Sequence, residues 1–191
     1  MYHIKDDQRS IRSSQMLYDA LVTLMATQPF DTIKVSELTR EAQVGRATFY
    51  RHFDTTEDIL RWQCDLTLDN LIQFIIQYLQ SQPDITALPL LKPLLRYFYV
   101  HDILIKQLIQ ANRIDILQEQ FLQRQQRFHN QLKHLFKIPD EYIQYILILR
   151  AVAAIQILIQ WIENDKTPAP DELADAISRI AGQMLAQGKL L

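Results

Sequence analysis

Glycine is scarce in this chain, and its scarcity restricts the fold more than any other feature of the sequence. Only three glycines occur in 191 residues, and most of the seven prolines lie between segments with helical periodicity. Chains built from sheets need many turns, and tight turns depend on glycine. The sequence therefore predicts an all-α fold of about nine helices.

Apolar residues recur at helical spacing in nine segments, which are separated by short breaks rich in Pro, Asp or Gly. The expected helices cover approximately residues 9–27, 35–42, 46–53, 57–80, 88–100, 102–111, 114–136, 141–164 and 170–187. Residues 1–8 precede the first helix and are expected to form a loose arm.

Composition argues against secretion and against a membrane. The single cysteine, Cys64, cannot form an internal disulfide and fits a reducing compartment, and the first ten residues lack the apolar core of a signal peptide. Residues 146–162 are strongly apolar, but they are short for a membrane span and contain Arg150, Gln156 and Gln160. We expect a cytoplasmic protein in which this segment is a helix buried on nearly all sides.

The stretch from Lys34 to Phe53 carries most of the information on function. It reads as two short helices joined by a tight turn at residues 43–45, with the second helix beginning at Arg46. A helix-turn-helix has this form, and its second helix fits the major groove of DNA. The apolar residues that would anchor it to its support are Val35, Leu38, Ala42, Val44, Ala47 and Phe49.

Polar side chains of the second helix have the chemistry that DNA contacts need. Arg46 can donate two hydrogen bonds to guanine, and Thr48 offers a hydroxyl and a methyl group to a base edge. Tyr50, Arg51 and His52 can reach phosphate oxygens, which position a protein without reading sequence. The chain has a net charge of −2, whereas residues 34–52 carry four basic and two acidic side chains, so positive charge is concentrated locally.

These residues also resemble a known family. Residues 48–53 (TFYRHF), preceded by 35–38 (VSEL) and followed by 57–60 (EDIL), resemble the DNA-binding domain of the TetR/AcrR family of transcriptional regulators. The resemblance implies a homodimer that binds a palindromic DNA operator, most often as a repressor that a small-molecule effector releases. The DNA-contacting residues that it implies are Lys34, Ser36, Arg46, Ala47, Thr48, Tyr50, Arg51, His52 and Thr56.

Three residues depart from the family pattern. Gln43 stands where the family usually has glycine, at a position that requires a left-handed backbone, and a side chain there costs on the order of 1 kcal/mol. Gly45 replaces a serine helix cap, which costs only a few tenths of a kcal/mol. Thr56 replaces a lysine that contacts phosphate, and Lys34 compensates in part. We expect DNA binding that is retained but weaker at high salt.

The resemblance divides the chain into a DNA-binding domain, residues 1–54, and a bundle for effector binding and dimerisation, residues 55–191. Residues 160–174 also resemble a subtype found in a dihydroxyacetone-kinase operon activator. The last two helices are expected to pair with those of a second copy. The residues expected at this interface are Ile155, Leu158, Ile159, Ile162, Ile177, Ile180, Ala181 and Met184.

The effector pocket is expected to have aromatic walls and one cation, although an ordinary core has the same composition. Its candidate residues are Tyr78, Tyr97, Phe98, His101 and Arg150. Arg150 lies within an apolar segment, so it must be paired, exposed at a dimer seam or in contact with a ligand.

No metal, cofactor or catalytic motif is indicated, and we expect no enzyme. His129, His134 and His101 could form a metal site only with further ligands, and Cys64 is more simply a buried thiol than a redox switch. Two other hypotheses stay open. The chain could act mainly through a partner protein, or it could be an enzyme that uses the helical pocket.

Overall fold

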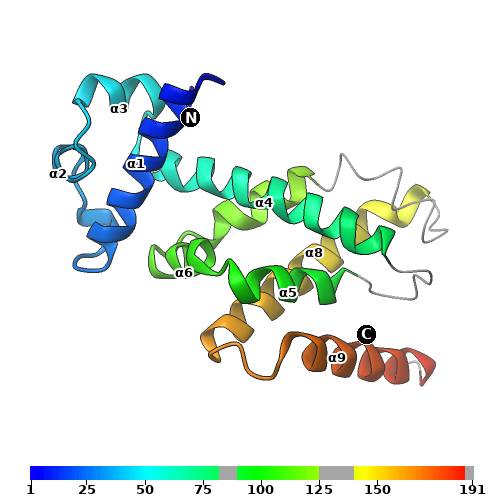
Figure 1. Cartoon of the computed structure of the whole chain (residues 1–191). Coiled ribbons are helices and arrows are strands. Elements are labelled where there is room, and N and C mark those ends of the chain that lie inside the picture. The colour runs from blue at the N-terminus through cyan, green and yellow to red at the C-terminus, as the bar shows by residue number, and fades with distance from the viewer. Residues whose placement is uncertain (82–89, 125–139, 188–191) are drawn as a thin grey trace. The chain divides into compact units, whose positions relative to one another are not determined.

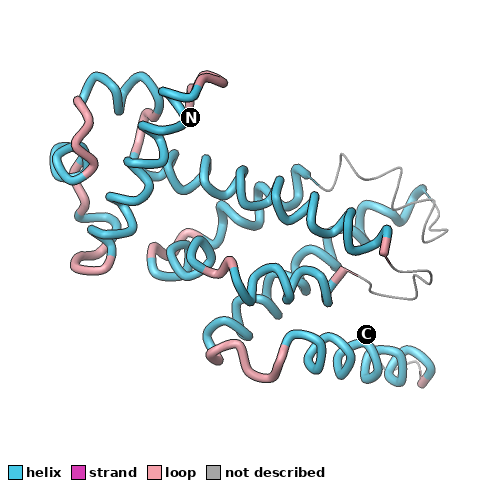
Figure 2. The backbone as a smooth tube through the Cα atoms, viewed as in Figure 1, coloured by secondary structure: helices cyan, strands magenta, loops and turns pink. Residues whose placement is uncertain are grey.

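The computed structural model of the chain describes residues 1–81, 90–124 and 140–187. These residues are helical apart from turns and loops, and they contain one isolated bridge, Tyr2–Phe53, and no strand (Figures 1 and 2). The predicted all-α fold is therefore confirmed.

The chain forms two compact units. Unit 1 consists of Met1–Thr67 and Ile103–Gln126, and unit 2 consists of Leu68–Asp102 and Arg127–Leu191. Helix α4, Thr56–Gln80, contributes its first half to unit 1 and its second half to unit 2. The expected boundary after residue 54 follows the sequence motif rather than packing, and it stays a prediction.

Unit 1 begins with three helices, α1 (Gln8–Met25), α2 (Val35–Glu41) and α3 (Arg46–His52), and a 3-10 turn, η1 (Phe30–Thr32), precedes α2. Asp7 caps α1 because its carboxylate accepts a hydrogen bond from the Ser10 backbone N–H at 2.8 Å. Both short helices pack on α1. The fully buried side chains of this core include Leu17, Leu21, Met25, Leu38, Phe49, Phe53 and Ile59.

Unit 1 is completed by α6 (Ile103–Gln110), which packs on α1, and by the helical residues 114–124. Three pairs of side chains tie residues 113–124 to the first half of α4. Arg113 bonds to Glu57, Arg61 bonds to Glu119 at 2.6 Å, and Arg124 bonds to Asp65 at 2.7 Å.

Unit 2 contains α5 (Leu91–Val100), α8 (Asp140–Glu163) and α9 (Pro170–Ala186). Proline fits the first turn of α9 because that position has no hydrogen-bonded N–H to lose. Helix α5 packs along α9, and two ion pairs join them: Arg96 with Asp171 at 2.5 Å and Lys92 with Asp175 at 2.7 Å.

Helix α8 is less covered than the sequence suggests. Residues Glu141–Glu163 are long and apolar enough to cross a membrane by length and composition, yet only 33% of their most apolar stretch is buried within the chain. The expectation of a helix buried on nearly all sides is therefore wrong for the single chain. The large apolar side chains that α8 exposes are Tyr142, Tyr145, Ile148, Leu149 and Val152.

Candidate nucleic-acid interface

The turn between α2 and α3 fixes the angle at which α3 leaves the unit. The Ala42 N–H closes α2 by bonding to the Leu38 carbonyl at 2.9 Å, and the Val44 N–H bonds to the Thr39 carbonyl at 3.0 Å. Between them Gln43 has φ of 54°, which is the left-handed conformation that the family resemblance implied. Gly45 then serves as the N-cap of α3 with an extended backbone.

Helix α3 has a buried side and an exposed side. Phe49 is fully buried, and its ring centroid lies 6.0 Å from that of Phe53, which in turn lies 6.1 Å from the ring of Trp62 on α4. Arg46 and Tyr50 are exposed, and the Tyr50 ring touches the edge of the Phe49 ring with centroids 5.2 Å apart. The aromatic contacts hold a short helix on its support and leave its polar side chains available.

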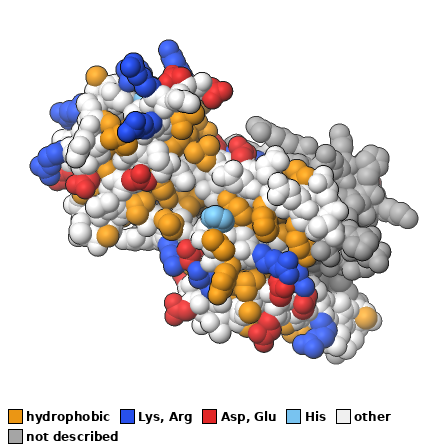
Figure 3. Space-filling view, viewed as in Figure 1, with side chains coloured by type: hydrophobic (Ala, Val, Ile, Leu, Met, Phe, Trp, Pro, Cys, Tyr) orange, Lys and Arg blue, Asp and Glu red, His pale blue; other side chains and the backbone are white. Residues whose placement is uncertain are grey.

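Most of the residues expected at DNA are exposed or partly exposed. Lys34, Ser36, Arg46, Ala47, Tyr50 and Arg51 are exposed, and Thr48 and Thr56 are partly exposed. An Arg51 guanidinium nitrogen lies 3.4 Å from the Thr48 hydroxyl. Figure 3 shows Lys and Arg side chains projecting from the surface of the N-terminal helices. Their contacts with DNA stay predictions.

His52 is an exception, and its position corrects the expected phosphate contact. Its side chain is only 1% exposed, and its Nε2 lies 3.0 Å from the Ser13 hydroxyl of α1. Burial and the neighbouring Arg51 lower the pKa of His52, so the ring is held neutral. A ring buried in this way is out of reach of a phosphate. His52 instead joins the end of α3 to α1, a contact hidden from sequence reasoning because 39 residues separate the partners.

The connection from α3 to α4 is also fixed by hydrogen bonds. The Asp58 carboxylate accepts hydrogen bonds from the Thr55 backbone N–H at 2.9 Å and the Thr55 hydroxyl at 3.0 Å. Asp58 is only 3% exposed, so the hydrogen bonds that hold the turn come from a buried carboxylate. Thr56 is the first residue of α4 and stays partly exposed beside it.

Three of the five expected effector residues in unit 2, Tyr97, Phe98 and His101, are joined by ring contacts. Tyr97 and Phe98 are buried, and the His101 ring lies 4.7 Å from the Tyr97 ring. Tyr78 is half-buried, with the Arg96 guanidinium 5.5 Å from its ring centroid. Arg150 is half-buried, and burial lowers the pKa of its guanidinium.

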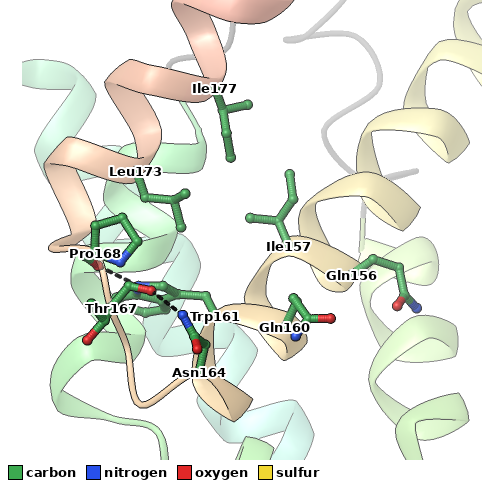
Figure 4. Close-up of a pocket in the computed structure, with 9 residues that line it drawn as sticks. All are labelled: Gln156, Ile157, Gln160, Trp161, Asn164, Thr167, Pro168, Leu173 and Ile177. Carbon is green, nitrogen blue, oxygen red and sulfur yellow. Dashed lines mark hydrogen bonds between the residues drawn. The ribbon is translucent and has the colours of Figure 1, made fainter.

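A hollow of about 730 Å³ lies elsewhere in unit 2, between the C-terminal half of α8 and α9 (Figure 4). None of the five expected effector residues lines it. Its lining consists of Gln156, Ile157, Gln160, Trp161, Asn164, Thr167, Pro168, Leu173 and Ile177. The Trp161 indole N–H donates to the Pro168 carbonyl at 2.8 Å, which fixes one wall.

The residues expected at a dimer interface divide by burial. Ile155, Leu158 and Ile162 are at most 5% exposed within the single chain, which corrects their assignment: they belong to the core of unit 2. Ile159, Ile177 and Ala181 are partly exposed. Ile180 is 50% exposed and Met184 is 40% exposed.

The candidate residues for metal binding or redox chemistry are His101, His129, His134 and Cys64. Across residues 1–81, 90–124 and 140–187, no group of three His, Cys, Asp or Glu side chains could hold a metal ion. His129 and His134 lie outside the described residues. Cys64 is fully buried, and burial together with Asp65 raises the pKa of its thiol to about 12, so its thiolate is scarce at neutral pH.

The fold of the whole chain recurs in known protein structures. A protein of Listeria innocua, Lin0861, has a TM-score of 0.76 at 18% identity, covering 95% of this chain and 96% of that one. The ligand-free structure of RolR has a TM-score of 0.55 at 21% identity, covering 87% and 89%. The fatty acid degradation regulator FadR from Bacillus halodurans has a TM-score of 0.56 at 14% identity, covering 92% and 95%. Identities this low show a shared fold alone.

Two family models match the sequence itself. The model described as bacterial regulatory proteins, tetR family, matches residues 17–61, which include α2, the turn and α3. The model described as transcriptional regulator C-terminal region matches residues 86–183, more than half of the chain. No curated protein matches the sequence. The chain belongs to the TetR family of bacterial regulatory proteins.

Proposed function

We propose that this regulator is a repressor whose homodimer binds a palindromic operator through α3 of each copy. The observation that carries the proposal is the two-sided form of α3, with Phe49 fully buried and Arg46 and Tyr50 exposed. Family membership supports DNA binding, dimerisation and a ligand site in the C-terminal part, and members are regulators rather than enzymes.

Each exposed residue has a distinct role in this proposal. Arg46, in the first turn of α3, reads guanine, and Thr48 contacts a neighbouring base. Tyr50 and Arg51 bind phosphates of the DNA backbone, and these contacts set the position of α3 along the duplex. Lys34 supplies a further positive charge at the start of α2, where it offsets the missing lysine at Thr56.

We assign the dimer interface to the uncovered sides of α8 and α9. The exposed side chains Ile148 and Val152 lie on α8, and Ile180 and Met184 lie on α9. Gln156 and Gln160 interrupt the apolar surface of α8 and would be costly against lipid, whereas a protein partner can hydrogen-bond them. A second copy of the chain therefore fits this surface better than a membrane does.

The effector in this proposal is a small apolar or aromatic molecule that binds among Tyr78, Tyr97, Phe98, His101 and Arg150. The adjacent rings of Tyr97 and His101, which are tilted by 37°, provide an aromatic surface, and Arg150 provides a positive charge for an acidic group. Binding would release the operator. The same proposal includes a C-terminal part of the subtype found in the dihydroxyacetone-kinase operon activator.

Selection of binding sites from a random DNA library tests the proposal. The dimer should select a palindrome whose half-sites are about 34–36 Å apart, one helical turn of DNA or a multiple of it. Replacement of Arg46 by alanine should cost about 1–3 kcal/mol of binding and relax the sequence preference at one position. The matched control is Arg179→Ala, an exposed arginine on α9. A folded dimer that selects no sequence would overturn the proposal.

A second candidate function is a co-regulator that acts through a partner protein. The left-handed Gln43 in the turn and the uncharged Thr56 favour it, because both weaken the DNA-binding apparatus. Salt separates the two functions. For a DNA-binding protein, the logarithm of the affinity falls linearly with the logarithm of the salt concentration, with a slope set by its phosphate contacts. Binding that responds neither to salt nor to Arg46→Ala would favour the co-regulator.

A further inference from the structure

The N-terminal residues do not form the loose arm that the sequence suggests. They pair with the segment that follows α3: the His3 N–H donates to the His52 carbonyl at 2.8 Å, and the Asp54 N–H donates to the Met1 carbonyl at 3.3 Å. Tyr2 and Phe53 form the isolated bridge between these bonds. In Figure 1 the N-terminus lies beside the end of α3.

The side chain of Tyr2 is held at its far end by a shared carboxylate. The Tyr2 hydroxyl donates to one oxygen of Asp65 on α4. Arg124 donates to the other oxygen at 2.7 Å and to the Asp65 backbone carbonyl at 3.0 Å. The side chains of Asp65 and Arg124 are only 17% and 11% exposed. Three segments distant in sequence therefore meet at one partly buried carboxylate.

The position of this contact matters because α3 is short. A helix of seven residues has little stability of its own, so its direction depends on the groups to which it is attached. The last carbonyls of a helix have no partner within the helix, and the His3 N–H supplies one for His52. The same last turn carries Tyr50 and Arg51, which are exposed on the proposed DNA surface.

We propose that residues 1–3 are a strap that positions the C-terminal end of α3, and that the Tyr2–Asp65–Arg124 cluster is the latch that holds the strap. The inference rests on the proposed function, since it assigns the strap to operator binding. Tyr2 and Asp65 are positioning residues. The carboxylate would repel a phosphate, so the latch acts through the direction of α3 and not through a contact of its own with DNA.

The test compares Tyr2→Phe, which removes only the hydroxyl, with Tyr99→Phe, an exposed tyrosine of α5. Operator affinity is measured over a range of salt concentrations. We expect Tyr2→Phe to lose about tenfold in affinity, because a hydrogen bond to a charged group is lost. The slope of log affinity against log salt should not change, because no phosphate contact is lost. The control should match the wild type in both measurements.

Two further variants separate positioning from a general loss of stability. Asp65→Asn should lose at least as much affinity as Tyr2→Phe, because it also weakens the bond to Arg124, and the double variant should lose no more than Asp65→Asn alone. The fraction of dimer and the thermal unfolding midpoint of unit 2 should be the same in these variants as in the wild type, although their operator affinity falls. An unchanged affinity in Tyr2→Phe would overturn the strap. A salt slope that falls by about one would also overturn it, because it would show a direct phosphate contact.

A measurement without DNA keeps this test independent of the operator. The Phe53 N–H bonds to the Phe49 carbonyl at 2.8 Å and closes the last turn of α3. Amide hydrogen exchange at Phe53 and Asp54 should be faster in Tyr2→Phe than in the wild type or the control. If no operator is found, the proposed function fails while faster exchange still supports the strap. Unchanged exchange would overturn the strap even where operator binding is present.

Discussion

Gln43 holds a backbone conformation that favours glycine, in the turn that directs α3. Its φ is 54°, and its side chain is exposed, so no contact of the side chain explains the choice of residue. In this region the β-carbon of an L-residue approaches the next carbonyl oxygen, at a cost of roughly 1–2 kcal/mol. The residue therefore stores strain beside the proposed DNA surface.

Gln43→Gly should remove this strain and raise the free energy of unfolding by about 1 kcal/mol, which is a rise in melting temperature of about 2–4 °C. Thermal unfolding followed by circular dichroism measures the change. The matched control is Gln77→Gly in the exposed part of α4, which should lower stability by about 1 kcal/mol. Equal losses in both variants would show that Gln43 is unstrained.

The conformations of Gln43 and Gly45 could be expected in advance, whereas the burial of His52 could not. The resemblance to the TetR family implied the left-handed position of Gln43 and the N-cap position of Gly45, and both are confirmed. The burial of His52 does not follow from local pattern, because it depends on Ser13 of another helix. Polar residues on a short helix look alike in sequence whether they face water or a neighbouring helix.

At the scale of elements, the first turn of α4 is tied to residues 113–119 by charge. The Glu57 carboxylate binds Arg113 and also Arg61, the latter at 2.9 Å, and Arg61 reaches Glu119 as well. These bonds, with Arg113 as the largest influence, hold the pKa of Glu57 below its usual range, although burial acts in the opposite direction. Arg113 also lowers the pKa of Asp115.

The sign of the resulting pH dependence follows from the lowered pKa. The unfolded chain binds protons at Glu57 near pH 4.5, whereas the folded chain does so only at lower pH, so folding stability is lost as pH falls below that value. Glu57→Gln should be less stable than the wild type by about 1 kcal/mol at pH 7, and the difference should shrink between about pH 5 and pH 3.

Urea unfolding at pH 7, 5 and 3.5 measures this difference. Glu163→Gln, on an exposed glutamate of α8, is the control, and its difference from the wild type should be small at every pH. A difference for Glu57→Gln that stays constant over the whole range would mean that the ion pairs with Arg113 and Arg61 add nothing to stability.

The helices could be predicted from the sequence, but the way they pair could not. The helices themselves follow from periodicity and from the positions of the prolines, as Pro170 in the first turn of α9 illustrates. The pairing of α5 with α9 through Arg96 and Asp171 has no local signal, because the partners are 75 residues apart. Likewise, an apolar helix such as α8 shows the same composition whether its own chain or a second copy covers it.

At the scale of the whole molecule, α8 and α9 of unit 2 expose apolar side chains that the described residues of the chain do not cover. Val152 and Ile148 lie one and two turns before Gln156 on α8, and Ile180 and Met184 follow Ile177 along α9. Gln156 and Ile177 both line the hollow between these helices (Figure 4). Their spacing places these exposed side chains near the hollow, on the surface that we propose a second copy covers.

Ile180→Glu should convert the dimer to a monomer, because each copy would place a charge in the apolar centre of a symmetric interface, and the two charges would face each other. Sedimentation velocity across a range of protein concentrations measures the change. Ile11→Glu is the matched control, since Ile11 is a similarly exposed isoleucine on α1, 44% against 50%, and it should leave the dimer intact.

The same variant links dimerisation to operator binding. A monomer carries one α3 and can engage one half-site, so it loses the gain in effective concentration that a linked second half-site provides. Operator affinity of Ile180→Glu should therefore fall by about 100-fold or more, whereas a single half-site should bind wild type and variant alike. A variant that stays dimeric would move the interface away from α9. A monomer with full operator affinity would show that this regulator reads its site one copy at a time.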